Sequence, residues 1–484
     1  MIPSAPASSR PIAHPWIVLL IATIGTFMAI LDSSIVNIAL ARIMGEFHVS
    51  VDDIEWVMTA YMIAFAVSMP ATAALRERLG AKRVYLLGLW LFTAGSLLCS
   101  VAWSLVTLVA FRIFQALGAG VLVPAALVMI SEAFPPTERG RAIGWWGIGA
   151  MLAPAIGPTL GGVLVQTIGW RSIFYLNLPV GLVNIWLTHR YLPSDAARIP
   201  PHPFDGIGLV SLSTALISFL TVCSRVHEWG WTSSLAGFCY ALGLGAFALF
   251  CWTEPRHPDP LMDPRIFRRR NFSLTIILSF LRAFALFGSV FLLPLYLQRL
   301  LGYSPVRTGW LMLPFAVCVG VLMPLGGWLV DRIGPQTPVA IGTALTSGAL
   351  YLYKYLNADG NMLLILAGQI LRGIGIGLAA APVTSAAISA VAPPRRAVAS
   401  GLLNITMQVG GAFGIAALGT LYHWQQSLYL RLDGATPTLA SVRAFQDVFA
   451  VASAVTLTGV VPALLLDNRA HLHGQAQEQA VLVE

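Results

Sequence analysis

Charged residues are scarce in this 484-residue chain. Asp, Glu, Lys and Arg together make up 10% of it, whereas 57% of the residues are hydrophobic. Soluble domains carry roughly 25% charged residues. A chain of this composition cannot cover its own surface with polar groups, so lipid must be part of its solvent. The scarcity of charge excludes a soluble globular protein and predicts an integral membrane protein.

Two further signals are missing from the sequence. No G-x-x-x-x-G-K-[ST] phosphate-binding loop occurs, so ATP hydrolysis by this chain is excluded and an ion gradient must drive any transport. The five cysteines all fall in apolar segments and show no short ligand spacing. They are interpreted as small apolar residues. We therefore expect no metal, no cofactor and no enzymatic activity.

Long apolar runs, by contrast, fill most of the chain. A helix needs about 20 apolar residues to cross the hydrocarbon core of a membrane. Fourteen candidate segments occur, so the sequence predicts an all-α integral membrane protein with 14 transmembrane helices. The first run is too long for a secretory signal and is interpreted as a mature helix. The segments are 16–40, 54–74, 83–101, 105–131, 139–165, 170–190, 207–224, 233–253, 272–298, 308–330, 337–356, 361–384, 397–422 and 444–466.

The basic residues predict the orientation of these helices. Most of the 29 Lys and Arg residues fall in the two tails and in alternate loops. The positive-inside rule places such loops in the cytoplasm. We therefore expect both termini to be cytoplasmic. The net charge of +8 then reflects topology and gives no indication of nucleic-acid binding.

An internal repeat divides the chain. The stretch "ATAALRERLGAKR" (71–83) follows the second apolar segment, and "GGWLVDRIGPQ" (326–336) follows the tenth. A small residue, Leu, an acid, Arg and Gly recur at the same offsets in both, which indicates two similar six-helix bundles. The predicted domains are an N-terminal bundle (1–200), a linker with two inserted helices (201–262), a C-terminal bundle (263–470) and a cytoplasmic tail (471–484).

Several motifs carry a resemblance to a known family. The stretch "LDSSIVNIAL" (31–40) resembles a first-helix signature, and "GWWGIGAMLAPAIGPTLGG" (144–162) resembles the fifth-helix motif of exporters. Together with the repeated loop motif, "GWRSIFYLNLPVG" (169–181) and "ASGLLNITMQVGGAFG" (399–414), they resemble the major facilitator superfamily. The match is to its 14-helix drug:proton antiporter branch, the EmrB/QacA type. The chain departs from the usual pattern at Ala41, Ala73, Glu77, Ala116 and Ala153.

The resemblance implies both a fold and a function. The fold is the major facilitator fold, with two six-helix bundles and two inserted helices in the inner membrane. The function is proton-driven export of small lipophilic or amphipathic compounds by alternating access. Some relatives of this type work with a periplasmic adaptor and an outer-membrane channel, and others act alone. The alternatives are a proton-coupled exporter or symporter of one metabolite, and a non-transporting receptor or channel.

Ionisable residues within apolar segments are functional candidates. Asp32 lies in the first segment, and Arg112 lies where the family's fourth-helix motif places an Arg linked to proton transfer. A guanidinium cannot release its proton at working pH. It can favour the ionised form of a neighbouring acid in one conformation and withdraw in another. We expect Asp32 to carry the proton and Arg112 to control it. The alternative for Asp32 is a helix-end residue bonded to Ser33, Ser34 or Asn37.

The two loop motifs predict a conformational latch. An acid of one bundle would pair with a base or a helix end of the other bundle and release it in each cycle. Positive-inside anchoring is the alternative interpretation of the basic residues. The candidate latch residues are Glu77, Arg78, Gly80, Asp331, Arg332 and Gly334.

The fifth-helix motif predicts close helix packing. Glycines let helix backbones approach in lipid, and a proline removes an N–H group and bends a helix. The resemblance implies that this segment seals the interface between bundles and favours antiport over leak, whereas ordinary tight packing is the alternative. The motif residues are Gly144, Gly157, Pro158, Gly161 and Gly162.

A substrate cavity is expected to be apolar and aromatic, because such cavities bind lipophilic compounds with little discrimination. Arg372 is interpreted as the counterpart of Arg112, and Arg282 as a contact for acidic substrates, with snorkelling or ion pairing as its alternative. Trp56 also fits an interface belt. The cavity candidates are Asn37, Trp56, Tyr61, Gln115, Arg282, Arg372, Asn404 and Gln408.

Overall fold

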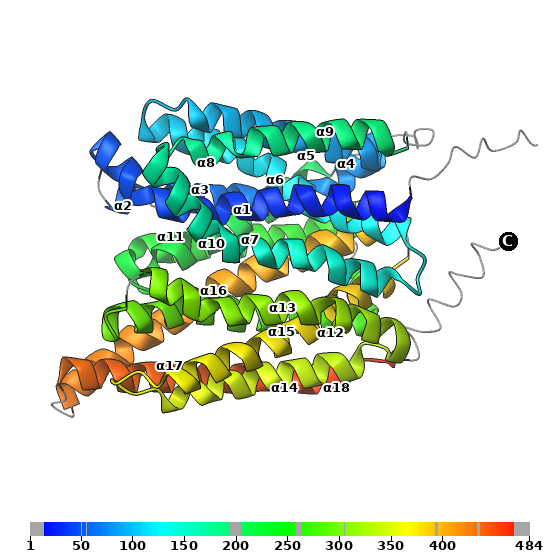
Figure 1. Ribbon diagram of the computed structural model, residues 1–484. Helices are drawn as coiled ribbons and strands as arrows, with labels where there is room; N and C mark the ends of the chain where they lie inside the picture. The colour runs from blue at the N-terminus through cyan, green and yellow to red at the C-terminus, as the bar shows by residue number, and fades with distance from the viewer. Residues whose placement is uncertain are drawn as a thin grey trace, which may run out of the picture.

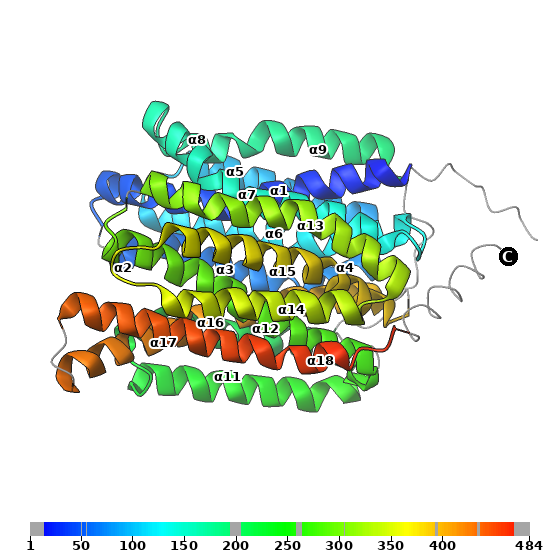
Figure 2. The same cartoon turned by 60° about the horizontal axis from the view of Figure 1, so that its bottom comes forward.

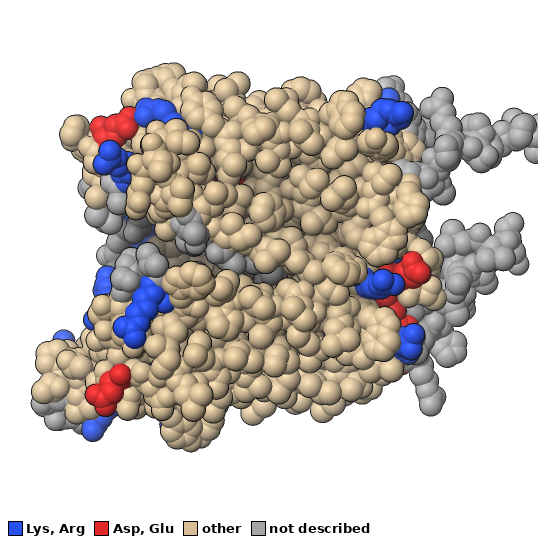
Figure 3. Space-filling view, in the orientation of Figure 1, with Lys and Arg blue, Asp and Glu red and all other residues tan. Residues whose placement is uncertain are grey.

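The computed structural model describes residues 14–49, 51–54, 56–193, 205–257, 264–303, 305–392, 395–432 and 436–468. These residues form helices, and no strand occurs among them. Ten of the helices they form are long and apolar enough to cross a membrane. On the face shown in Figure 3, charged side chains gather at the two ends of the molecule and leave an uncharged band between them. The structure thus agrees with an all-α membrane protein.

The N-terminal half begins with a 33-residue helix whose first residue is Pro15. Proline suits this position because its missing N–H has no partner there in any helix. Ser104 starts another long helix with a capping box. The predicted segment 54–74 is broken at Pro70, which stands between two helices. The helices of this half are α1 (Pro15–Phe47), α2 (Val51–Ile54), α3 (Trp56–Ser68), α4 (Ala71–Leu79), α5 (Ala81–Ser100), α6 (Leu105–Ala133), α7 (Arg139–Thr167), α8 (Ser172–Tyr175) and α9 (Asn177–Tyr191).

Two inserted helices follow, α10 (Gly206–Trp229) and α11 (Ser234–Thr253). Leu212 and Leu216 of α10 are buried in one cluster with Met69 and Ile405, so α10 packs against both halves of the molecule. α11 packs mainly against α10 and lies at the edge of the molecule in Figure 2. Its Phe238 is 65% exposed, as expected for an apolar face turned to lipid.

The C-terminal half repeats the helical pattern and ends where the first half began. The start of α1 and the end of α18 lie at the same end of the molecule, on the right in Figure 1. The predicted tail 471–484 lies outside the described residues. The elements are η1 (Glu254–Arg256), η2 (Pro264–Arg268), α12 (Arg270–Leu295), η3 (Tyr296–Leu300), α13 (Pro305–Ile333), α14 (Gln336–Leu352), η4 (Tyr353–Tyr355), α15 (Met362–Ser389), α16 (Arg396–Leu432), α17 (Pro437–Thr458) and α18 (Val460–Leu464).

Close contacts at glycines show how the two halves correspond. In each half, a glycine with no side chain lets one helix backbone touch its neighbour. The same contact recurs at equivalent places, which matches α3 with α13, α5 with α14 and α6 with α15. The matched contacts are Gly118 with Gly88 and Gly375 with Gly342, then Gly120 with Phe65 and Gly377 with Val319.

The two halves meet closely at one end. A Cβ atom at Gly144 of α7 would lie 2.7 Å from Pro324 Cα of α13, so only glycine fits there. Gly327 of α13 likewise faces the backbone of Gly140. These contacts lie at the end where α1 begins, because α7 starts there and α13 finishes there. We call this end the closed end.

Candidate functional site

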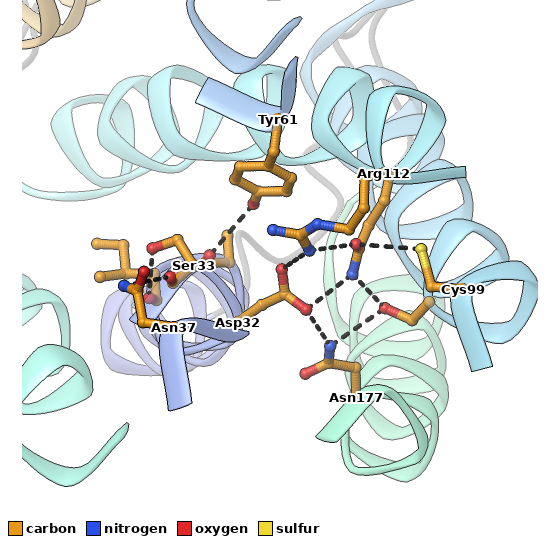
Figure 4. Close-up of polar contacts among 11 residues, drawn as sticks. Asp32, Ser33, Asn37, Tyr61, Cys99, Arg112 and Asn177 are labelled. Atoms are coloured by element: carbon orange, nitrogen blue, oxygen red, sulfur yellow. Dashed lines mark hydrogen bonds and ion pairs between the residues drawn. The ribbon is translucent and has the colours of Figure 1, made fainter. Parts of the chain in front are cut away.

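Asp32 lies in the middle of α1, and its side chain is 1% exposed. Its Oδ2 accepts a hydrogen bond from Arg112 Nη1 at 2.5 Å. Its Oδ1 accepts from Gln115 Nε2 at 2.9 Å and from Asn177 Nδ2 at 2.8 Å (Figure 4). A buried carboxylate is stable only when it is paired and hydrogen-bonded. The partners come from α6 and α9, so the alternative of a helix-end residue bonded within α1 is wrong.

Arg112 is held on three sides. Its Nη1 also donates to Gln115 Oε1 at 2.6 Å, and its guanidinium lies over the ring of Tyr61, 3.9 Å from the centroid. Ser96 Oγ accepts hydrogen bonds from Gln115 at 2.6 Å and from Asn177 at 3.1 Å. We call these residues the Asp32 cluster. Its members are Asp32, Tyr61, Ser96, Arg112, Gln115 and Asn177.

Two members of the cluster are missing from the sequence-based candidates. Asn177 begins α9 within the stretch 169–181, and the resemblance of that stretch was the one available signal for it. Ser96 is a small polar residue in an apolar helix, and nothing in the sequence distinguishes it. Uncharged polar residues are common in membrane helices, so their roles appear only when the helices are packed.

The arrangement links the charge of Asp32 to helix position. All three donors direct N–H groups at its two carboxylate oxygens. When a proton binds the carboxylate, the attraction of Arg112 for Asp32 is lost. The contact between α1 and α6 is therefore weaker in the protonated state. A group of this kind can couple proton binding to a change of conformation.

Asp331 connects the two halves at the closed end. Its Oδ1 accepts a hydrogen bond from the backbone N–H of Gly140 at 3.0 Å, and its Oδ2 accepts one from that of Arg141 at 2.9 Å. The first N–H groups of a helix have no partner within the helix. Asp331 of α13 therefore caps α7 of the other half. This geometry matches the pairing of an acid with a helix end of the neighbouring bundle, while the latch role stays a prediction.

The other candidate latch residues are less informative. Gly80 and Gly334 have φ angles of 84° and 81°, a left-handed region that favours glycine at these turns. Arg332 is exposed and lies over the ring of Trp328, 4.5 Å from the centroid. Arg78 is also exposed. The side chain of Glu77 lies outside the described part of the structure.

The glycines of the fifth-helix motif differ in their surroundings. Gly144 contacts α13 across the closed end, as described above. A Cβ atom at Gly157 would lie 2.7 Å from Ser34 Oγ of α1, whereas one at Gly162 would meet nothing within 4 Å. Close packing therefore requires some of these glycines and not others. Of the remaining motif residues, Gly161 faces Ile35 of α1. The side chain of Pro158 is not described, and α7 continues as one helix through positions 158 and 161.

The eight cavity candidates come from several helices of both halves. Tyr61 and Gln115 belong to the Asp32 cluster. Trp56 is exposed, and the guanidinium of Arg225 on inserted helix α10 lies 4.9 Å from its ring centroid. Trp56 therefore faces the inserted pair.

Three further candidates are amide side chains, and no hydrogen bond joins them to the Asp32 cluster within the described residues. Asn37 is exposed, and its Nδ2 donates to the carbonyl oxygen of Ser33 on its own helix. Asn404 makes the same kind of bond to Ser400 at 2.8 Å. Gln408 is half-buried on α16. Their place at a substrate cavity stays a prediction.

Arg372 is fully buried on α15. By the matched glycines it corresponds to Gln115 in sequence position. Its guanidinium nevertheless stacks on a ring that corresponds to the one beneath Arg112. It lies over Phe315, 4.2 Å from the ring centroid, and Phe315 corresponds to Tyr61. Each half thus has a buried guanidinium stacked on the corresponding ring.

The fold and the site define a class. The described helices form two corresponding halves of a multi-pass membrane protein, with an ion pair buried between helices and a close interface that one acid bridges. Corresponding halves of this kind are typical of secondary transporters. The chain belongs to the Major Facilitator Superfamily, whose family model matches residues 22–415 and again 275–482. It is a secondary transporter of that superfamily and not an enzyme.

Relatives of the chain include drug-resistance proteins. It is 36% identical over 404 residues to Multidrug resistance protein Stp of Mycobacterium tuberculosis, covering 83% of this chain and 75% of the relative. It is 31% identical over 446 residues to Riboflavin transporter RibZ of Clostridioides difficile, covering 92% and 96%. A crystal structure of the human organic anion transporter MFSD10 (TETRAN) matches with a TM-score of 0.65 at 15% identity, covering 94% of this chain and 100% of that one. This last likeness shows the fold alone.

Proposed function

We propose that this transporter exports small lipophilic or amphipathic compounds in exchange for protons, as a member of the 14-helix drug:proton antiporter branch. The observation that carries the proposal is the buried Asp32 cluster, which holds a carboxylate between donors of two other helices. Similarity to a multidrug resistance protein supports drugs and other toxic compounds as substrates.

The cycle follows from two contacts. Protonation of Asp32 weakens its bonds to α6 and α9, which frees α1 to move relative to them. Opening of the closed end must break the cap that Asp331 places on α7. Interfaces of this kind switch between discrete packings rather than deforming gradually. Proton release restores the Arg112 contact and completes the exchange.

The proposal includes a placement in the membrane. Four more spans, in addition to the ten apolar ones, make up the 14. One is the pair α3 and α4, and the others are the single helices α7, α9 and α14. The closed end faces the cytoplasm, and both termini lie there, in agreement with the positive-inside rule. The membrane is the inner, or plasma, membrane. A periplasmic adaptor and an outer-membrane channel are candidate partners, and copurification with an adaptor tests this part.

The test is proton-coupled export by the purified protein. Proteoliposomes with an imposed pH gradient would be supplied with a panel of fluorescent lipophilic compounds, and both dye movement and proton flux would be measured. We expect Asp32→Asn to abolish exchange. Asp359→Asn, at an exposed acid in a turn, is the matched control and should retain exchange. Full-rate exchange by Asp32→Asn would reject the assignment of Asp32.

A second candidate function is transport of one metabolite. The observation in its favour is the similarity to the riboflavin transporter, which extends over nearly the whole of both chains. Riboflavin is therefore the first single compound to test in the same proteoliposomes. Saturable transport of riboflavin with no transport of the dye panel would favour this candidate.

A further inference from the structure

The interior of the C-terminal half carries positive charge that its described residues do not neutralise. Arg372 is 0% exposed, and none of its three guanidinium nitrogens has a hydrogen-bond partner among the residues that the structure describes. Within the described part of the chain, Arg282 of α12 donates only to the thioether sulfur of Met407, at 3.3 Å, and its Nε has no hydrogen-bond partner. A thioether is a weak acceptor. Neither arginine forms an ion pair within the described residues, in contrast to Arg112.

Arg282 lines a pocket between helices of the C-terminal half. Two threonines, Thr343 and Thr346 of α14, and Ala379 of α15 form part of its wall. The matched glycines show what fills the corresponding space in the N-terminal half. There, larger apolar side chains stand at the same positions, and all three are fully buried. They are Leu89, Phe92 and Leu122.

The replacement of these large side chains by smaller ones leaves room for the pocket. It also makes part of the wall polar, because two threonine hydroxyls stand where the other half has hydrocarbon. Thr346 Oγ1 donates to the carbonyl oxygen of Gly342 at 2.8 Å. Thr456 also lines the pocket, and its Oγ1 donates to the carbonyl oxygen of Ala452 at 2.7 Å. The polar groups of the lining that remain to donate into the pocket are the guanidinium of Arg282 and the hydroxyl of Thr343.

Arg372 stands next to this pocket along α15. The pocket contacts Ile376, Ala379 and Val383 on one face of that helix. Residues three or four apart lie on the same helix face. Arg372 precedes Ile376 by four positions, so it continues this face one helical turn further from the closed end. Two guanidinium groups thus lie along one wall of the C-terminal half.

Arg372 is fully buried and Arg282 is half-buried. A guanidinium removed from water is costly without an anionic partner. Arginine remains charged at working pH, so it cannot avoid this cost by losing a proton. An anionic group that enters the pocket would supply the missing acceptor. Carboxylates match the planar fork of a guanidinium and can accept two hydrogen bonds from it. The pocket has a volume of about 20 Å³, which suits a small group such as a carboxylate, and Leu278 and Leu281 make the adjoining wall apolar.

We propose that this pocket binds the carboxylate of an exported amphipathic compound, with Arg282 as the direct contact and Arg372 beside it. The inference rests on the proposed export function and names a substrate class for it, amphipathic carboxylates. It also assigns different tasks to the two halves: the Asp32 cluster handles the proton, and the C-terminal pocket recognises the compound.

The test compares an acid with its neutral isostere. Binding of 1-naphthaleneacetate and of 1-naphthaleneacetamide to the purified full-length protein would be measured by equilibrium dialysis. We expect the protein to prefer the acid, and Arg282→Gln to reduce this preference roughly 10- to 100-fold, because a hydrogen-bonded charge is lost. Arg282→Lys should retain part of the preference. Arg307→Gln, at an exposed arginine of the same half, is the matched control and should keep the full preference.

Three results would overturn the proposal. One is equal binding of acid and amide by the unaltered protein. Another is a preference that survives Arg282→Gln in a protein that elutes as a single species and melts cooperatively. The third is competition by chloride or inorganic phosphate as effective as that by 1-naphthaleneacetate, which would make the pocket an inorganic anion site. If the unaltered protein keeps this binding preference but shows no proton-driven export in proteoliposomes, the proposed function would be contradicted instead.

Discussion

Arg112 and Arg372 stack on corresponding aromatic rings in the two halves of the molecule, yet the charges around them differ. Arg112 bonds to the carboxylate of Asp32 and stacks on Tyr61. Arg372 stacks on Phe315, and no carboxylate pairs with it among the described residues. The repeated helices thus preserve the position of a guanidinium but not its neutralisation. The two halves share an arrangement of helices, and different side chains at corresponding positions make them chemically different.

This difference has an energetic consequence. In the N-terminal half, Asp32 offsets the cost of burying a guanidinium. In the C-terminal half, the corresponding cost is unrelieved until an anion binds. The second half is therefore expected to be the less stable one in the absence of substrate, and ligand binding should stabilise it by mass action. Substitutions at the two arginines test this directly.

The largest effect is expected for Arg112→Met. The substitution leaves Asp32 buried with its two amide donors and no cation. Breaking a buried ion pair by removing one partner typically costs about 3–5 kcal/mol. We expect a clear fall in the apparent melting temperature of the purified protein in detergent, measured by the intrinsic fluorescence of tryptophan.

The control for this prediction is the double variant Asp32→Asn with Arg112→Met. It removes both charges, so it should recover much of the lost stability. A single variant as stable as the unaltered protein would show that the ion pair does not hold α1 to α6.

The opposite effect is expected for Arg372→Met. This substitution removes a buried charge for which the described residues offer neither an anion nor a hydrogen-bond acceptor, and it leaves an apolar side chain of similar length. We expect the apparent melting temperature to rise in the absence of anionic compounds, by an amount equivalent to about 1 kcal/mol or more. Arg307→Met, at an exposed position, should change it little. A fall in the melting temperature like that of Arg112→Met would show that Arg372 has an acceptor, and would contradict the difference in charge neutralisation between the two halves.

Part of this picture can be predicted from the sequence. Asp32 and Arg112 are conspicuous because a charge in an apolar run is costly and therefore rarely kept without a purpose. Their contact cannot be predicted, because they are 80 residues apart and the packing of α1 on α6 brings them together. The lack of a carboxylate beside Arg372 cannot be predicted either, since it depends on the helices that pack around α15 rather than on the sequence of α15.

The fold shows the same limit. Apolar runs predict where helices lie, and the glycine-rich motifs predict that they pack closely. Helix length is less predictable. The apolar windows 170–190 and 337–356 contain helices of 15 and 17 residues, α9 and α14, because turns and short helices take the rest of each window. The count of 14 spans thus stays a proposal beyond the ten apolar spans.

The smallest effect is expected at the contact that joins the two halves. Asp331→Ala removes the acceptor for the N–H groups of Gly140 and Arg141 at the start of α7. Loss of a helix cap costs about 1 kcal/mol. The contact exists only when the halves meet, so the loss destabilises only the arrangement in which the closed end is shut. The ratio of molecules with this end separated to molecules with it shut should therefore rise about fivefold.

The shift can be measured at Met323, which is 4% exposed and packs against Gly147 across the closed end. A cysteine placed there in a background without the five native cysteines should react with a water-soluble maleimide about fivefold faster when Asp331→Ala is added. Asp359→Ala is the matched control. Equal rates in both backgrounds would mean that the cap does not hold the closed end. A faster rate would show that one carboxylate of the C-terminal half biases the position of the N-terminal half, which is the property a latch requires.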